Sequence, residues 1–226
     1  LGMDTISAGN IVAAYLASED EFGNAELVHE LLPKIAHREG IGDTLAEGVD
    51  RAHEELGVDN WSVKGLEFAA HDGRAIHGQG LSYAVANRGA DHMYGNMLGP
   101  EYAGTIDPEG LFEEKVDMLI HRENKMAVRD SGVICAFGID DYIDESQIAT
   151  LLGTDWERLD AMGGRVIELE RHFNNQRGMN REDDRLPYDL PDFETALEQY
   201  YTRRGWDNDG VVTDPVETGS SALGDD

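Results

Sequence analysis

The spacing of apolar residues constrains this 226-residue chain most, because the spacing is helical along most of its length. In the first such segment, apolar side chains at 6, 11, 12, 15 and 16 share one helix face. Strand signals are limited to two short runs, 61–63 and 211–213. The pattern predicts a mainly α, multihelical fold with helices, caps included, over 4–16, 24–40, 43–57, 81–86, 107–129, 144–152, 154–174 and 191–205.

Local signals predict where several of these helices begin and end. Asn24 and Asp43 are expected to cap the second and third helices, and Gly57 to end the third. Pro33 is expected to kink or break the second helix before Gly40 ends it. Glycines and weak periodicity over 58–80 predict a crossing segment with a boundary near residue 70. We therefore expect domains over 1–70 and 71–216 and a frayed acidic tail over 217–226.

The charge balance bears on environment and partners. Acidic residues number 46 against 18 basic ones, and the net charge is −28. Such a surface repels nucleic acid and anionic lipid, so neither is expected as a partner. In molar salt the Debye length shrinks to about 3 Å and the self-repulsion is screened. No apolar run approaches the ~20 residues needed to span a bilayer. Together with the acidic surface, this predicts a halophilic cytoplasmic protein.

A lone cysteine, Cys135, ends the hexapeptide Asp130-Ser131-Gly132-Val133-Ile134-Cys135. One thiol forms no disulfide within the chain, and a four-iron cluster needs four thiolates, of which this chain supplies at most one. The chain opens on Leu, without an initiator Met, inside a second short turn that ends in Asp. This beginning predicts a piece of a longer protein.

Nine ordered stretches resemble the two C-terminal helical domains of the tungsten-containing aldehyde ferredoxin oxidoreductases, and together they cover nearly the whole chain. They are LGMDTIS at 1–7, REGIGD and LAEGV at 38–49, VKGLE at 63–67, GQGLSYA at 78–84, NRGADH at 87–92, DSGVIC at 130–135, LERHFN at 169–174, DDRLP at 183–187, and YY with RRGWD at 200–207.

The resemblance implies that two related turns, each with a D-x-x-G-L-x pattern, bind one pterin apiece. The first survives as Gly2-Met3-Asp4. A carboxylate such as that of Asp4 accepts adjacent N–H donors of a pterin edge as a bidentate pair. The residues alone also allow Asp4 to be the N-cap of the helix that follows, and both roles together are compatible.

In the second turn, the resemblance assigns Asp130 to a pterin and Cys135 to the fourth ligand position of the iron–sulfur cluster. Ile134 stands for the family's Leu, and Val133 stands where the family has Gly, with Gly132 displaced by one. This departure puts the backbone path around the pterin in question. Judged without the resemblance, the cysteine is a small buried hydrophobe and the aspartate shapes a turn.

His92 corresponds to a family histidine that approaches the tungsten, which implies that its neutral imidazole takes up the proton released during aldehyde oxidation. Spacing alone favours a satisfied histidine at a helix C-terminus. His71 and His77 flank glycines of the crossing segment and are weaker candidates for lining a pocket.

The resemblance implies oxidation of a small aldehyde to a carboxylic acid, with electrons passing through a [4Fe-4S] cluster to ferredoxin. The implied cofactors are a tungsten bis-pterin (tungstopterin) and that cluster, and neither is expected to be retained by this chain alone. Tungsten and molybdenum are not distinguished, and a homodimer is left open. The remaining partner is the protein's own N-terminal half. The alternatives are a relative acting on another oxo group and a cofactor-free helical binding or assembly module on the same scaffold.

Overall fold

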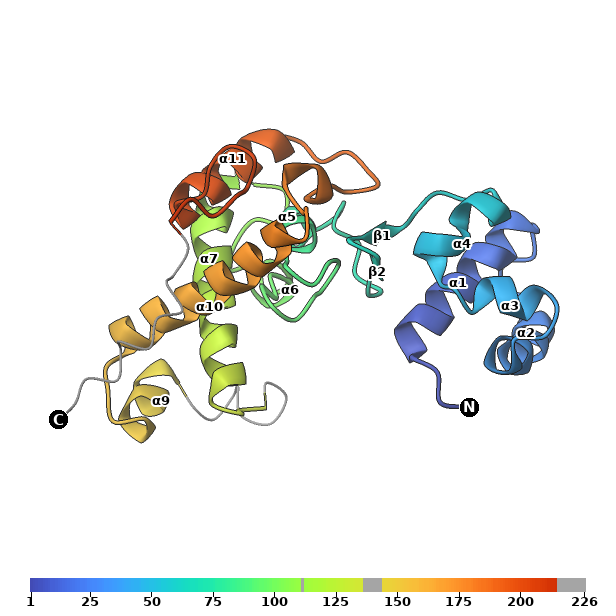
Figure 1. The fold of residues 1–226 in the computed structure, drawn as a ribbon, viewed down its shortest axis with the longest axis horizontal. Helices are drawn as coiled ribbons and strands as arrows, with labels where there is room; N and C mark the ends of the chain where they lie inside the picture. The colour runs from blue at the N-terminus through green and yellow to red at the C-terminus, as the bar shows by residue number, and fades with distance from the viewer. Residues whose placement is uncertain (111, 136–143, 215–226) are drawn as a thin grey trace.

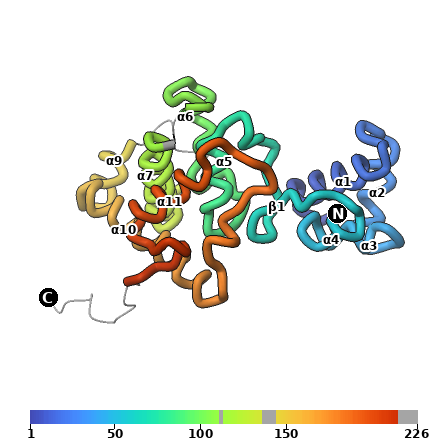
Figure 2. The backbone as a smooth tube through the Cα atoms, turned by 90° about the horizontal axis from the view of Figure 1, so that it is seen from above, coloured from blue at the N-terminus to red at the C-terminus, as the bar shows by residue number. Residues whose placement is uncertain are grey.

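The computed structural model describes residues 1–110, 112–135 and 144–214, and the fold is mainly α, as predicted. The described chain forms a small lobe of helices α1 to α4 and a larger lobe that begins at α5, with a short β-hairpin between them (Figure 1). The view from above in Figure 2 shows the same separation.

The small lobe consists of α1 (Thr5–Ser18), α2 (Ala25–His37), α3 (Ile41–Leu45) and α4 (Val49–Leu56). Asp4 and Asn24 cap α1 and α2 through hydrogen bonds that their side chains accept, as predicted. The helices bury one shared apolar cluster, formed by Ile11, Val12, Leu16, Leu31, Ile35, Leu45, Val49 and Ala52. Burial of these side chains holds the short helices in place, since helices of five to eight residues are not stable alone.

Two predictions for the small lobe are wrong. The single helix expected over 43–57 is two helices, because Gly48 adopts a left-handed φ of 78° and turns the chain between them. The second helix runs without interruption from Ala25 to His37 across Pro33, and it ends at Arg38 rather than Gly40. Buried residues on both sides of the proline keep the helix together.

The hairpin of β1 (Ser62–Val63) and β2 (Leu66–Glu67) confirms the first predicted ribbon. Lys64 and Gly65 both have positive φ, the conformation of a two-residue hairpin turn. The Lys64 ammonium is buried in the large lobe, where it donates to Ala84 O at 2.5 Å. The Glu67 carboxylate accepts from the Val49 N–H at 3.1 Å and from the Ser7 hydroxyl at 2.9 Å. The hairpin therefore ties the two lobes together.

The large lobe is built around α7, against which α5, α10 and α11 pack. Its elements are α5 (His77–Val85), α6 (Leu98–Tyr102), α7 (Phe112–Ser131), α9 (Glu145–Leu151), α10 (Trp156–Gln176), the 3-10 turn η1 (Arg181–Asp183) and α11 (Phe193–Arg204). Asp144 caps α9 at the predicted start of its range, and α11 stops at Gly205 as predicted. Asp155, one residue after the predicted start at 154, caps α10. A single bridge between Trp206 and Val212 corresponds to the second predicted ribbon.

Three elements of the large lobe differ from the prediction. Helix α5 begins four residues earlier than expected. The sequence pattern missed this start because all residues of α5 are buried, so the helix has no amphipathic stripe. The five-residue helix α6 was not predicted, and α7 begins at 112 rather than 107.

A buried ion cluster joins four segments of the large lobe to the hairpin. The Asp184 carboxylate pairs with the Lys64 ammonium at 2.7 Å and with both terminal nitrogens of Arg171, at 2.9 and 2.7 Å. It also accepts from the Tyr201 hydroxyl, and the Arg171 Nε donates to Gly210 O. All three charged side chains are at most 1% exposed. Removing Asp184 would leave the Lys64 ammonium and the Arg171 guanidinium buried without their shared partner, which makes this carboxylate an obligatory part of the fold.

The predicted domain boundary near residue 70 stays a prediction, and the predicted tail over 217–226 lies outside the described residues. Among the described residues, no helix has both the length and the apolar character required to cross a bilayer.

Candidate functional site: two cofactor turns and a histidine loop

The C-terminal end of α7 carries the second predicted turn. The Ile134 N–H donates to Arg129 O at 2.9 Å and the Val133 N–H donates to Asp130 O at 3.1 Å. This pair of bonds is a Schellman cap, in which the residue after the cap is left-handed and usually glycine. Val133 occupies that position with φ of 56° and is 92% exposed. The valine therefore follows the path expected of the glycine that the resemblance places there.

The polar groups of this turn face outward. Asp130 and Cys135 are both exposed, and Ile134 is partly buried against Val128 and the residues around it. The alternative interpretation of Cys135 as a small buried hydrophobe is wrong, since the thiol is accessible. An exposed carboxylate and an exposed thiol five residues apart can both reach a group outside the helix.

The first predicted turn precedes α1. Gly2 is left-handed, with φ of 77°, and a Cβ there would meet no atom within 4 Å. The Asp4 Oδ1 accepts from the Ser7 N–H at 2.8 Å, so the N-cap role is confirmed. Its other oxygen has no hydrogen-bond partner among the described residues and is free for a ligand. Residues 1–4, Met3 included, line a cavity of about 390 Å³ between α1 and α2.

The two turns share one backbone feature. Gly2 and Val133 hold the same position in the D-x-x-G-L-x pattern, and both have a left-handed φ. Asp4 and Cys135 both end the pattern. The turns lie on different lobes (Figure 1), and no hydrogen bond or ion pair connects them in the described part of the chain. The structure therefore places the two turns apart from each other.

His92 lies in the loop between α5 and α6, not at a helix C-terminus. Partial burial lowers the pKa of His92, His71 and Arg88 lower it further, and the Asp91 carboxylate acts in the opposite direction. A neutral imidazole is therefore favoured, as proton uptake requires. The His71 ring lies beside it, with 5.7 Å between ring centroids.

A polar network that the site prediction did not include lies between this loop and α10. The Tyr94 hydroxyl donates to Glu170 Oε1 at 2.9 Å, and the Asn87 amide donates to Glu170 Oε2 at 3.3 Å. Burial and the carboxylates of Glu170 and Asp130 raise the pKa of Tyr94. The network thus brings the histidine loop close to the second turn. Its sequence signal was present, because Asn87 and Glu170 lie in stretches that carried the resemblance.

The residues present can supply part of the ligands that the implied cofactors need. Asp4 and Asp130 offer carboxylate oxygens to pterin N–H donors, and Cys135 offers one thiolate to a cluster. Within the described ranges, no group of three or more His, Cys, Asp or Glu side chains is arranged to hold a metal ion.

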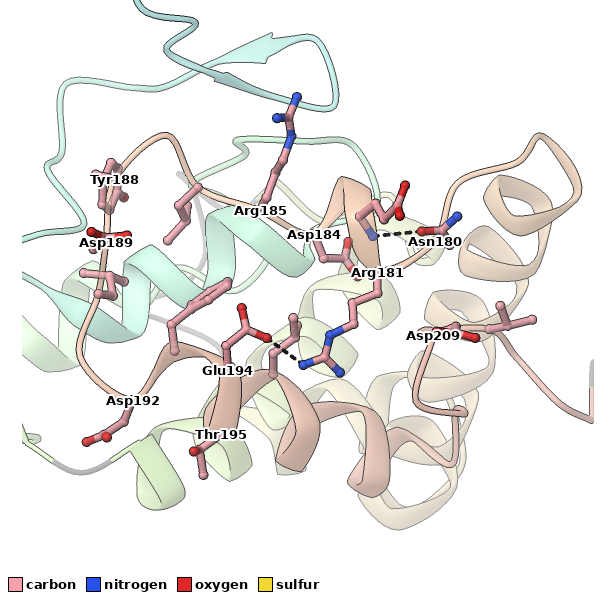
Figure 3. A pocket seen from close by; sticks show the side chains of 16 residues that line it. Asn180, Arg181, Asp184, Arg185, Tyr188, Asp189, Asp192, Glu194, Thr195 and Asp209 are labelled. Carbon is pink, nitrogen blue, oxygen red and sulfur yellow. Dashed lines mark hydrogen bonds and ion pairs between the residues drawn. The ribbon is translucent and has the colours of Figure 1, made fainter.

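A cavity of about 1000 Å³ lies elsewhere, between η1 and the start of α11. Figure 3 shows Arg181 reaching from η1 toward Glu194 of α11, a pair 2.7 Å apart. Six carboxylates are among the lining residues: Glu182, Asp184, Asp189, Asp192, Glu194 and Asp209. None of the predicted site residues lines this cavity.

Comparison with solved structures identifies the fold. The chain superposes on the active site complex BamBC of benzoyl coenzyme A reductase with a TM-score of 0.71 and 20% sequence identity, over 93% of this chain and 42% of that one. The shared feature at this identity is the mainly helical fold.

The family follows from sequence comparison. The family model for aldehyde ferredoxin oxidoreductase, domains 2 & 3, matches residues 1–216, and the chain belongs to this family. This confirms the predicted fold class and resemblance.

Curated relatives give the same result. The tungsten-containing aldehyde ferredoxin oxidoreductases of Pyrococcus furiosus and Thermococcus kodakarensis are 35% and 36% identical to this chain, over 94% and 93% of its length. The WOR-like subunit of the aliphatic sulfonate oxidoreductase of Pyrococcus furiosus is 28% identical over 96% of the chain. The chain spans 42% of the length of the first two relatives, so it corresponds to part of a larger protein.

Proposed function

We propose that this chain is the helical portion of an enzyme that oxidises a small aldehyde to the carboxylic acid and passes the electrons through a [4Fe-4S] cluster to ferredoxin. The observation that carries the proposal is the α7 turn, where Val133 follows the left-handed path of a glycine and leaves Asp130 and Cys135 exposed. The polypeptide absent from this chain would supply the other three thiolates.

Each predicted residue has a defined role in this proposal. Asp4 and Asp130 seat one pterin each by accepting N–H donors, and the turns Gly2-Met3 and Val133-Ile134 set the direction of these carboxylates. Cys135 ligates the cluster. A tungsten bis-pterin, when bound, would supply the two-electron redox chemistry. His92 takes up the proton released as the aldehyde gains its second oxygen from water, since partial burial favours its neutral form.

The surroundings of the enzyme are also proposed. The net charge of −28 supports a protein that works in the cytoplasm at high salt, where the repulsion is screened. The same charge disfavours nucleic acid and anionic membranes as partners.

The test is to express the chain with its native upstream half in high salt and to measure tungsten, molybdenum and iron by mass spectrometry. About four irons per chain are expected, with iron depleted in Cys135→Ser. A matched control is Ser131→Ala, which changes an exposed side chain of the same turn without removing a ligand. Aldehyde-dependent reduction of ferredoxin completes the assignment. Equal iron in Cys135→Ser and the parent would refute the role of the thiol, and absence of metal from both would leave the helical binding module as the function.

A further inference from the structure

A second histidine connects the histidine loop to a cavity between the lobes. His71 precedes α5 in the crossing segment, and its ring centroid lies 5.7 Å from that of His92, with the planes at 50°. The two imidazoles are therefore neighbours. On its other side, His71 lines a cavity of about 820 Å³ between α1 and residues 57–74.

The cavity offers few groups that could replace His71 as a proton carrier. Helix α1 contributes Asn10 and small side chains, and the aromatic residues are Phe22, Trp61, Phe68 and Tyr188. Burial raises the pKa of the tyrosine, which keeps its hydroxyl protonated.

Imidazole is the side chain whose ordinary pKa lies near neutral pH, and the charged groups nearby are carboxylates and guanidinium groups. Asp72 is paired with Arg74 at 2.6 Å, and this ion pair lowers the pKa of Asp72. Asp59 also lines the cavity. Beside His92, Asp91 pairs with Arg88. Carboxylates and guanidinium groups keep their charge at neutral pH, so they set the local field without carrying protons.

We propose that His71 is the proton-relay residue that carries protons from His92 to water in the cavity between the lobes. The inference rests on the proposed function. Oxidation of one aldehyde by one water yields the carboxylic acid, two electrons and two protons. The electrons leave toward the iron–sulfur acceptor, and the protons have to leave separately. An imidazole accepts a proton on one nitrogen and releases one from the other, so the pair forms a continuous path.

The test uses the full-length holoenzyme with variants His71→Gln and His92→Gln and with His29→Gln, an exposed histidine of the small lobe, as the control. A positioned acid–base group contributes about 10²-fold or more. Because cavity water replaces part of the relay, we expect kcat of His71→Gln to fall about tenfold at low buffer concentration, with KM unchanged. Added imidazole should restore the rate of His71→Gln and leave His29→Gln, which matches the parent, unaffected.

A second readout does not depend on turnover. NMR titration of the histidine rings should show the pKa of His92 rising in His71→Gln, because a neighbouring positive charge has been removed. An unchanged kcat at low buffer together with an unchanged pKa of His92 would overturn the relay while leaving the proposed function intact. Full activity in His92→Gln would refute the role of His92 and with it the relay, whereas no aldehyde oxidation by the parent would refute the proposed function itself.

Discussion

Replacing Val133 with glycine should stabilise this chain, although most substitutions destabilise a protein. A left-handed conformation costs a residue with a Cβ about 1–2 kcal/mol, and Val133 adopts φ of 56°. The side chain is 92% exposed, so its removal forfeits little buried area. Glycine loses about 0.5–1 kcal/mol more than other residues in conformational freedom on folding. The difference predicts a gain of about 0.5–1 kcal/mol in the free energy of unfolding, a Tm increase of about 1–4 °C.

Urea denaturation of the purified chain measures this gain as a shift of the midpoint at constant slope. Two controls separate the causes. Val133→Ala keeps the Cβ and should recover only the part of the cost that is due to branching at Cβ. Met162→Gly removes a half-exposed side chain from inside α10 and should destabilise the chain by about 1 kcal/mol. A midpoint for Val133→Gly at or below that of the parent would show that the turn is not strained.

Three further predictions concern charge. Asp184→Asn should lower the free energy of unfolding by about 3–5 kcal/mol, because Lys64 and Arg171 are left buried and uncompensated. The control Glu194→Gln, at an exposed ion pair, should cost at most about 1 kcal/mol in the same urea assay. The pKa of His92 is lowered in the folded state, so below its ordinary value of 6.5 the unfolded chain binds more protons. Stability should therefore fall as the pH drops below 6.5, and a urea series over acidic pH should show a smaller decline in His92→Gln. Raising KCl from 0.1 M to 2 M should raise Tm, because the net charge of −28 is screened. Sucrose at equal osmolality should not reproduce this salt dependence. A Tm that does not change with KCl would contradict the halophile prediction.

Local signals predicted those parts of the fold that local interactions determine. The caps at Asn24 and Asp144 were correct because each side chain satisfies an N–H group of its own first turn. The boundaries that failed depend on tertiary contacts. Helix α5 is buried on every side and carries no periodic signal, and the division at Gly48 accompanies a contact with the Glu67 carboxylate, eighteen residues from Val49.

The candidate site was predictable only through the resemblance, since a lone Cys135 and a turn aspartate have common structural explanations. The structure adds what residue types could not give: the accessible thiol, the left-handed path of Val133, and the approach of His71 to His92. The His71–His92 ring pair joins two segments that no spacing of residues in the sequence connects. The roles of these residues in catalysis stay predictions.

The relative position of the two predicted turns depends on residues that belong to neither of them. Asp184 holds the hairpin tip through Lys64, and three residues further along the hairpin Glu67 holds the N-terminal ends of α1 and α4. The Glu67 carboxylate accepts from the Ser7 hydroxyl, and the Asp4 carboxylate accepts from the N–H of the same residue, Ser7. One continuous set of polar contacts therefore runs from the core of the large lobe to the first cofactor turn. Because a buried ion cluster tolerates little displacement, these contacts fix the first turn relative to the large lobe, whose α7 carries the second turn.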